Sequence, residues 1–227
     1  GARIIGLQHD WTEETVETAF EELIERNGQS DGIIYWQMTR GTAPRNHMFP
    51  KNTSVNFMAY TRDYPDLSKG WEQGVKAIVT RDLRWLMCHV KSVNLLANVL
   101  AKEAASQQGA AEALLDRDGL GVIEGGSSNL FVIKDGVMKT PPLSEHILPG
   151  ITRQFVLELA RDAQIPVEEG YTSKEELLQA DELFITSTGL EVMPVTTVDH
   201  VSIADGVVGP ITRQLQRLYD GKVTTEV

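Results

Sequence analysis

The stretch "EGGSSNLFVIKDG", residues 124–136, carries a glycine- and serine-rich turn directly into a strand. The glycines permit a tight backbone, and the serines and Asn129 can hydrogen-bond an anion or their own backbone. The apolar run ends at Asp135-Gly136, a pair typical of hairpin turns, so a strand and a hairpin are predicted here. Glu124 opens the turn, and its carboxylate is either an ordinary solvated or salt-bridged group or one directed at a cation.

Helices and strands are both expected outside this stretch, which places the chain in the α+β or α/β class. Residues 12–26 are predicted to form a helix, because Thr12 can cap it, acidic residues fill its first turn and Asn27-Gly28 ends it. A second helix is expected from Val90 to near Gly109. The other expected elements are strands at 31–41, 53–61, 74–85 and 181–189, short strands with Asp-Gly turns within 112–140, helices at 148–164 and 210–221, and a hairpin at 198–209.

A polar, proline-containing segment, "RDYPDLSKG" at 62–70, is the best candidate for a domain boundary. We predict a small N-terminal α/β domain over residues 1–64, an interdomain linker at 65–70 and a large domain over 71–227. Because the chain opens with "GARIIGLQHD", as though inside an element, the small domain is expected to be truncated at its start.

Composition limits the partners of the chain. The 227 residues are 41% hydrophobic, enough for a sizeable core. Basic residues number 21 and acidic residues 32, and the net charge of −11 argues against nucleic acid or an anionic membrane as a partner. No apolar run reaches membrane-spanning length, and a single cysteine, Cys88, excludes an intrachain disulfide and suits the cytoplasm. The histidines follow no metal-ligand spacing, so no metal site is predicted.

Lys91 lies where a strand-like run is expected to end and a helix to begin. The helix dipole and apolar neighbours such as Val90 and Val93 would lower the pKa of its amine, which suits an imine-forming lysine. The alternative is a solvated lysine at an element boundary. A carboxylate such as Glu124, held beside a pyridine nitrogen, would keep that nitrogen protonated, as pyridoxal phosphate chemistry requires.

Two further segments can bind an anion. "LPGIT" (148–152) opens a helix with free backbone N–H groups and the Thr152 hydroxyl, and "TSTG" (186–189) ends a strand with three hydroxyls. Each segment alone is equally well explained as an ordinary helix cap or strand end.

The runs "DLRWLMCHVKSVNLLANVLAKEAA", "EGGSSNLFVIKDG", "ILPGITR" and "DELFITSTGLEVMPV" together resemble the class IV aminotransferases, the fold type IV enzymes that use pyridoxal phosphate. The resemblance covers nearly the whole chain and implies a two-domain fold whose large domain has a mixed, barrel-like sheet. It implies that Lys91 holds the cofactor as an internal aldimine and that Glu124 partners the pyridine nitrogen. The other implied cofactor contacts are Leu148, Ser127 near the ring, and Ile151, Thr152, Ser187 and Thr188 at the phosphate. A tyrosine and a phosphate-binding arginine that the family carries in its N-terminal segment have no match here.

The loop "RGTAPRNHMFP" (40–50) holds Arg45 and His47 two residues apart. An arginine fork and a nearby imidazole can grip a carboxylate, although a solvated loop is the plainer explanation. The Arg-x-His pattern is similar to the carboxylate trap of D-amino-acid aminotransferases, which work as homodimers in which this loop reaches the neighbouring subunit's site. The resemblance therefore implies a transaminase for a D-amino acid such as D-alanine and a 2-oxo acid such as 2-oxoglutarate, with Arg45 and His47 serving the partner subunit.

Other functions stay open at this point. The same scaffold could carry an aminodeoxychorismate lyase, a branched-chain transaminase or an amine transaminase, and a lyase would need no second oxo acid. A non-catalytic protein that merely keeps the fold is a different class, and the presence of Lys91 argues against it.

Overall fold

The computed structural model describes residues 1–225, and the chain divides into two compact units, Gly1–Asp66 and a second one that starts at Leu67. The first unit contains helix α1 (Glu13–Asn27) and an antiparallel pair of strands, β1 (Ile33–Thr39) and β2 (Asn56–Arg62). All three elements were predicted from the sequence and are confirmed.

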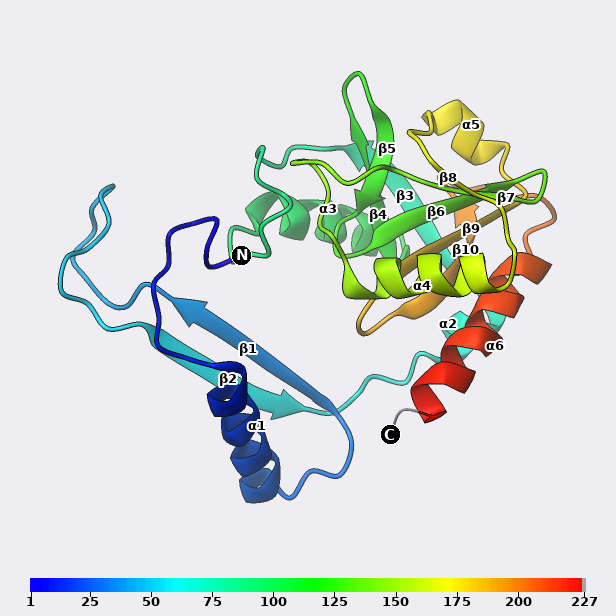
Figure 1. The fold of residues 1–227 in the computed structure, drawn as a ribbon. Helices are drawn as coiled ribbons and strands as arrows, with labels where there is room; N and C mark the ends of the chain where they lie inside the picture. The colour runs from blue at the N-terminus through cyan, green and yellow to red at the C-terminus, as the bar shows by residue number, and fades with distance from the viewer. Residues whose placement is uncertain (226–227) are drawn as a thin grey trace. The chain divides into compact units, whose positions relative to one another are not determined.

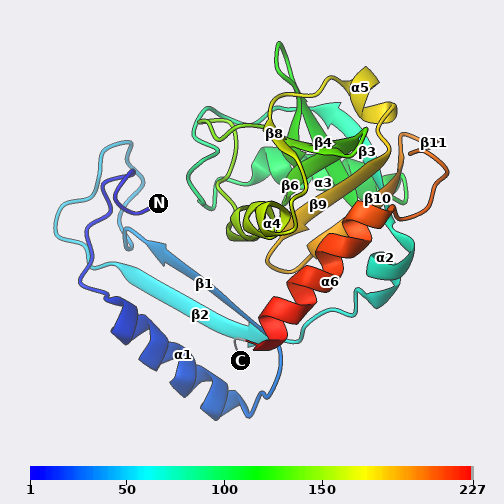
Figure 2. The ribbon, with the colours of Figure 1, turned by 45° about the vertical axis from the view of Figure 1, so that its right-hand side comes forward.

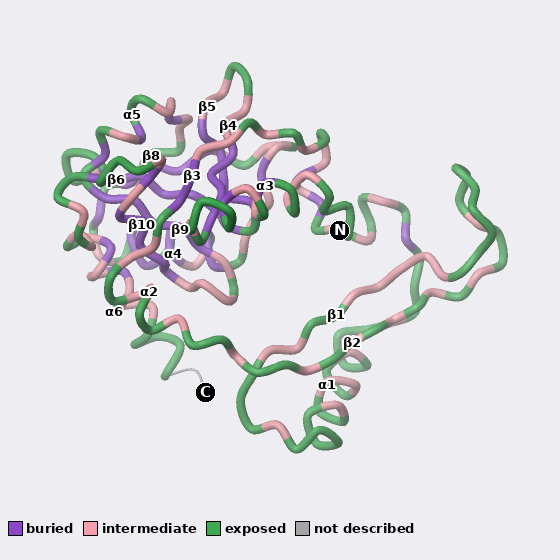
Figure 3. The backbone as a smooth tube through the Cα atoms, turned by 180° about the vertical axis from the view of Figure 1, so that it is seen from behind, coloured by how far each residue is buried: buried purple, intermediate pink, exposed green. Residues whose placement is uncertain are grey.

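The ends of α1 follow the capping residues. The Thr12 hydroxyl accepts a hydrogen bond from the Thr15 amide at 3.2 Å, and Gly28 ends the helix in the left-handed conformation, with φ of 60°. Phe20 reaches the sheet at Trp36, with 6.0 Å between the ring centroids. No residue of α1 is buried, and in Figure 3 this unit is drawn almost entirely as exposed or intermediate.

The second unit carries most of the secondary structure (Figure 1). Its helices are α2 (Ser68–Gln73), α3 (Leu96–Gln107), α4 (Ile151–Asp162), α5 (Lys174–Leu178) and α6 (Pro210–Thr225). Its strands are β3 (Val75–Arg81), β4 (Glu112–Arg117), β5 (Gly121–Gly125), β6 (Asn129–Lys134), β7 (Val137–Thr140), β8 (Val167–Glu169), β9 (Glu182–Ser187), β10 (Glu191–Val198) and β11 (Val201–Ser202). None of the helices in residues 1–225 combines the length and apolar character needed to cross a bilayer.

Six of these strands close into a ring. Strand β9 pairs with both β6 and β10, and β10 returns to β3, so that the order β3-β4-β5-β6-β9-β10 has no open edge. Strand β3 runs parallel to both of its neighbours, whereas the other pairs in the ring are antiparallel. The predicted mixed sheet with a barrel-like core is therefore confirmed.

Side chains alternate between the inside of the barrel and the helices outside it. Leu130 belongs to the cluster that fills the barrel, whereas its neighbour Phe131 packs outside, stacked on Phe184 at 4.7 Å. Helices α4 and α6 cover that outer cluster side by side (Figure 2). Helix α3 covers β3 and β4 through small residues such as Ala101 and Ala105.

Several boundaries differ from the sequence predictions, and three of these differences lie next to the candidate site or the domain boundary. The strand expected to reach residue 85 ends at Arg81, because the Asp82 carboxylate accepts a hydrogen bond from the Arg84 amide at 2.9 Å and turns the chain. The helix expected from Val90 begins only at Leu96, since local hydrogen bonds such as Leu95 N–H to Val93 O, 2.9 Å, hold the preceding residues in turns. Helix α2 begins inside the segment predicted as a linker.

Candidate active site

Glu124 lies on β5 with only 3% of its surface exposed. Its Oε1 accepts a hydrogen bond from Arg84 Nη1, and its Oε2 accepts one from Asn129 Nδ2 at 3.1 Å and one from the Leu148 amide at 3.1 Å. Burial raises the pKa of Glu124 to about 7, although the charge and hydrogen bond of Arg84 and the Leu148 amide oppose that rise. The carboxylate is therefore a buried, firmly held acceptor and not the solvated side chain that the sequence left possible.

Arg84 is a site residue that the sequence analysis did not single out. It follows β3, and its Nε and Nη2 donate to Asp82 at 2.9 and 2.8 Å, while Nη2 also donates to the His146 carbonyl at 3.1 Å. Asp82 in turn accepts a hydrogen bond from Arg117 Nε at 3.0 Å. The only local signal for this network was an aspartate two residues before an arginine at the end of a strand.

Asn129 ties three parts of the site together. Its Nδ2 bonds both Glu124 and the Leu148 carbonyl, the latter at 2.9 Å. A Cβ on Gly150 would lie 2.2 Å from Asn129 Oδ1, so only glycine allows the start of α4 to come this close. Asn129 is also the partner of Thr186 in the β6–β9 register. The Glu124 carboxylate, the start of α4 and the end of β9 are thus brought to one place.

The turn after Glu124 is held by a second buried carboxylate. Glu112, which is fully buried, accepts hydrogen bonds from Ser127 Oγ at 3.1 Å and Ser128 Oγ at 2.9 Å, and Lys102 Nζ lies 3.2 Å from it. A Cβ on Gly126 would lie 3.1 Å from the Lys102 side chain. Glycine and serine in this turn therefore serve its close packing, and a role of Ser127 near a cofactor ring stays a prediction.

Lys91 differs from its expected setting. It is exposed, and within residues 1–225 it makes no hydrogen bond or ion pair. Val90 is buried, but Val93 is 59% exposed and Leu96 is 74% exposed. The expected helix start and apolar surroundings of Lys91 are not found, because helix α3 begins five residues later and the larger apolar residues of its first turns, such as Leu96, are exposed. The segment is anchored instead by Cys88, whose amide donates to the Glu145 carbonyl at 2.8 Å.

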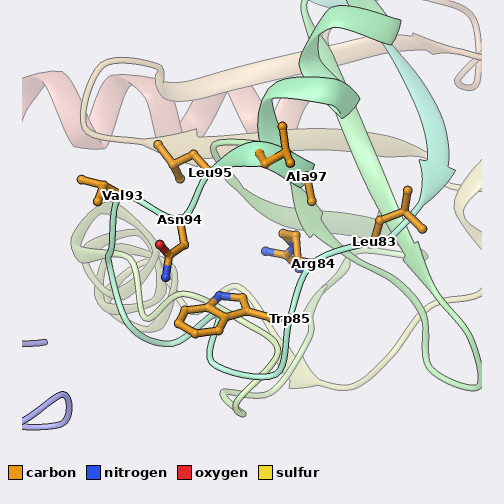
Figure 4. Close-up of a pocket in the computed structure, with 8 residues that line it drawn as sticks. Leu83, Arg84, Trp85, Val93, Asn94, Leu95 and Ala97 are labelled. Atoms are coloured by element: carbon orange, nitrogen blue, oxygen red, sulfur yellow. The ribbon is translucent and has the colours of Figure 1, made fainter. Parts of the chain in front are cut away.

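A cavity of about 490 Å³ opens beside this segment. Its lining comes from both limbs of the chain around Lys91: Leu83, Arg84 and Trp85 from the limb before it, and residues 93–97 from the limb after it (Figure 4). Arg84 thus contacts Glu124 and also lines an open space next to the lysine-bearing loop.

The predicted anion-binding segments are partly as expected. Gly150 provides no side-chain cap for α4, so the first amides of the helix remain available to an anion, and Ile151 is 79% exposed. Thr152, expected to point outward, is instead buried and hydrogen-bonds Tyr219, so its hydroxyl is already engaged. Ser187 is half-buried and accepts a hydrogen bond from the Leu190 amide at 3.2 Å, and Thr188 is exposed.

Arg45 and His47 lie in the first unit, in the loop between β1 and β2. Both are exposed, and neither has a hydrogen-bond or ion-pair partner in residues 1–225. Arg40, at the end of β1, is occupied, since it donates to the Gly6 carbonyl at 2.9 Å and lies 3.7 Å from the Phe49 ring centroid. The two loop residues are therefore free to bind an anion.

Comparison with known proteins identifies the family of the chain. The family profile "Amino-transferase class IV" matches residues 1–198. A D-alanine aminotransferase of Staphylococcus epidermidis is 47% identical over 220 residues, which is 96% of this chain and 78% of that protein. One from Bacillus licheniformis is 42% identical over 222 residues, 98% of this chain and 78% of that protein.

Solved structures show the same fold. The Escherichia coli branched-chain amino acid aminotransferase superposes with a TM-score of 0.87 at 28% identity, covering 97% of this chain and 75% of that one. The T.th. branched-chain amino acid aminotransferase with pyridoxamine 5'-phosphate gives a TM-score of 0.88 at 28% identity, covering 99% and 75%. The resemblance stated from the sequence is confirmed: the chain belongs to the class IV aminotransferases.

Proposed function

We propose that the chain is a pyridoxal-phosphate-dependent transaminase that moves an amino group between a D-amino acid and a 2-oxo acid, of the D-alanine and 2-oxoglutarate type. The observation that carries the substrate class is the identity of 42–47% to proteins named D-alanine aminotransferase over 95–98% of the chain. The branched-chain enzymes of the same fold are less similar, at 28% identity.

The described residues fit this cofactor. The Glu124 carboxylate is buried and retains acceptor capacity for a pyridine N–H, and the exposed Lys91 amine is free to react. The uncapped amides at Ile151 and Thr152, with Ser187 and Thr188, suit a phosphate group, while Leu148 fixes Glu124 through its amide. When bound, pyridoxal phosphate supplies an electron sink for charge that develops at the substrate α-carbon.

The residues of the chain then have separate tasks. Lys91 Nζ takes the α-proton of the bound amino acid and later returns a proton. Glu124 holds its negative charge against the ring nitrogen. Arg45 and His47 bind the substrate carboxylate, and because the carboxylate position decides which face of the α-carbon meets the lysine, they select the D-enantiomer.

We also propose that two copies form a homodimer in which Arg45 and His47 of each chain serve the other chain's Lys91. The negative net charge and the single cysteine are in keeping with small-molecule substrates and a cytoplasmic location.

The test is a panel of D- and L-amino acids against 2-oxoglutarate and pyruvate, with added pyridoxal phosphate. Turnover of D-alanine that requires an oxo acid supports the proposal. Preference for L-leucine or for amines, or product formation without an oxo acid, would replace it by a branched-chain transaminase, an amine transaminase or a lyase. A yellow protein that borohydride bleaches would separately establish the lysine imine.

A further inference from the structure

We propose that Arg84 is the positioning residue that keeps Glu124 Oε1 an unprotonated acceptor for the ring nitrogen of the cofactor. This inference rests on the proposed function, because that function supplies the ring nitrogen. Arg84 itself touches the carboxylate and acts on the reaction only through it.

The geometry fixes Arg84 in this role. Nε and Nη2 are committed to Asp82, at 2.9 and 2.8 Å, which directs Nη1 to Glu124. The side chains of Arg84, Asp82 and Glu124 are only 6%, 0% and 4% exposed, so little water competes with these hydrogen bonds. The guanidinium is thus clamped from one side while it holds the carboxylate on the other.

Counting acceptor positions identifies the oxygen that remains available. Each carboxylate oxygen can accept about two hydrogen bonds. Oε2 already accepts from Asn129 and Leu148, whereas Oε1 accepts, among residues 1–225, only from Arg84. A ring N–H directed at Glu124 would therefore share Oε1 with the guanidinium.

The charges around Glu124 act in opposite directions. Arg84 stabilises the ionised carboxylate, and Asp82 destabilises it, with Arg117 bound to the far side of Asp82 at 3.0 Å. Cys88 also senses these charges, and burial raises the pKa of its thiol. Loss of Arg84 and loss of Asp82 should thus change the proton affinity of Glu124 with opposite signs.

The direction in which Arg84 changes the proton affinity of Glu124 matters for catalysis. Glu124 and the ring nitrogen compete for one proton, and the more basic partner keeps it. Because burial already makes Glu124 more basic than an ordinary carboxylate, the opposing effect of Arg84 is what leaves the proton on the ring.

The experiment titrates Glu124 in the cofactor-free protein, using glutamate labelled with ¹³C at the carboxyl carbon and identifying the Glu124 resonance by its loss in Glu124→Gln. Arg84→Met should raise the midpoint by about one pH unit or more, which is about a tenfold gain in proton affinity. Asp82→Asn should lower it, and Arg84→Lys should restore most of the wild-type value. The matched control is Arg81→Met, which removes an exposed pair with Asp118.

Midpoints that stay unchanged in Asp82→Asn, or that move the same way in Asp82→Asn and Arg84→Met, would overturn the proposal. If Arg84→Met fails to fold, Asp82→Asn and Arg84→Lys still decide the question. In the holoenzyme, Arg84→Met should lower kcat by about tenfold or more, and a variant with wild-type kcat from about pH 6 to about pH 9 would also overturn it. The NMR titration needs neither cofactor nor substrate, so its failure is distinct from a failure of the proposed function, which the amino-acid panel tests.

Discussion

Replacing Glu124 by glutamine should change how the stability of the cofactor-free protein depends on pH. The folded chain holds Glu124 with a pKa of about 7, against an ordinary value of 4.5. A carboxyl group whose pKa is raised on folding binds more protons in the folded state than in the unfolded state between those values. Its contribution to the free energy of unfolding therefore falls as the pH rises from 4.5 to about 7.

The size of this loss follows from the two pKa values. Since one pKa unit corresponds to about 1.4 kcal/mol, the full effect is about 3 to 4 kcal/mol, and most of it falls between pH 5 and pH 8. Glutamine does not titrate, so Glu124→Gln lacks this loss entirely. Any constant effect of the substitution on packing cancels when the two pH values are compared.

The assay is urea denaturation of the cofactor-free wild type and variant at pH 5 and pH 8. The wild type should lose about 2 to 3 kcal/mol more unfolding free energy than Glu124→Gln over that interval. Glu158→Gln, at an exposed position on α4, is the control and should follow the wild type. Equal pH dependence in wild type and Glu124→Gln would refute the reasoning, because it would mean that folding does not alter the proton affinity of this carboxylate.

Three further predictions follow from the site and the fold. Lys91→Ala should abolish transamination while leaving the melting temperature unchanged, because Lys91 is exposed and makes no contact to lose within residues 1–225; retained activity would remove it from the mechanism. Mixing dissociated Lys91→Ala and Arg45→Ala chains should restore about a quarter of wild-type activity, since about half of the dimers are mixed and each has one intact site; confirmed mixed dimers without activity would show that the loop does not act in trans. Gly125→Ala should cost about 2 kcal/mol of stability by urea denaturation, because its Cβ would lie 2.1 Å from Ser128 Oγ, whereas Gly221→Ala, with open space around it, should cost nothing.

The parts of the molecule that sequence reasoning predicted are those decided by neighbouring residues. Thr12 and Gly28 bracket α1 as expected, and the Asp135-Gly136 turn joins β6 to β7, because capping and turn chemistry act over a few residues. The closure of the sheet into a ring was predicted from the family resemblance and not from local patterns. Pairings such as Val75 with Val195 join residues that are too far apart in the chain for a local pattern to reveal.

The residues of the candidate site likewise divide into those that a local sequence pattern predicts and those that it does not. Glu124 could be singled out as a candidate because a glycine-serine turn marks its position, whereas its partner Arg84 lies 40 residues earlier, just after an ordinary strand end. The apolar neighbours of Lys91 suggested a covered setting, but Lys91 is exposed. A hydrophobic residue such as Leu96 predicts that its side chain is covered. It does not predict that other residues of the described chain provide the cover.

The closed ring of strands also limits when the second unit can fold during synthesis. Strand β3 opens the ring and β10 closes it, and their first paired residues, Val75 and Val195, are separated by more than half of the chain. Closing so long a loop is slow, and during synthesis it must wait until β9 and β10 have left the ribosome. Asn129 cannot gain its register partner Thr186 before then. Until β9 and β10 have emerged, the nascent chain therefore exposes unpaired edges on β3 and β6, which makes it prone to aggregation during this interval.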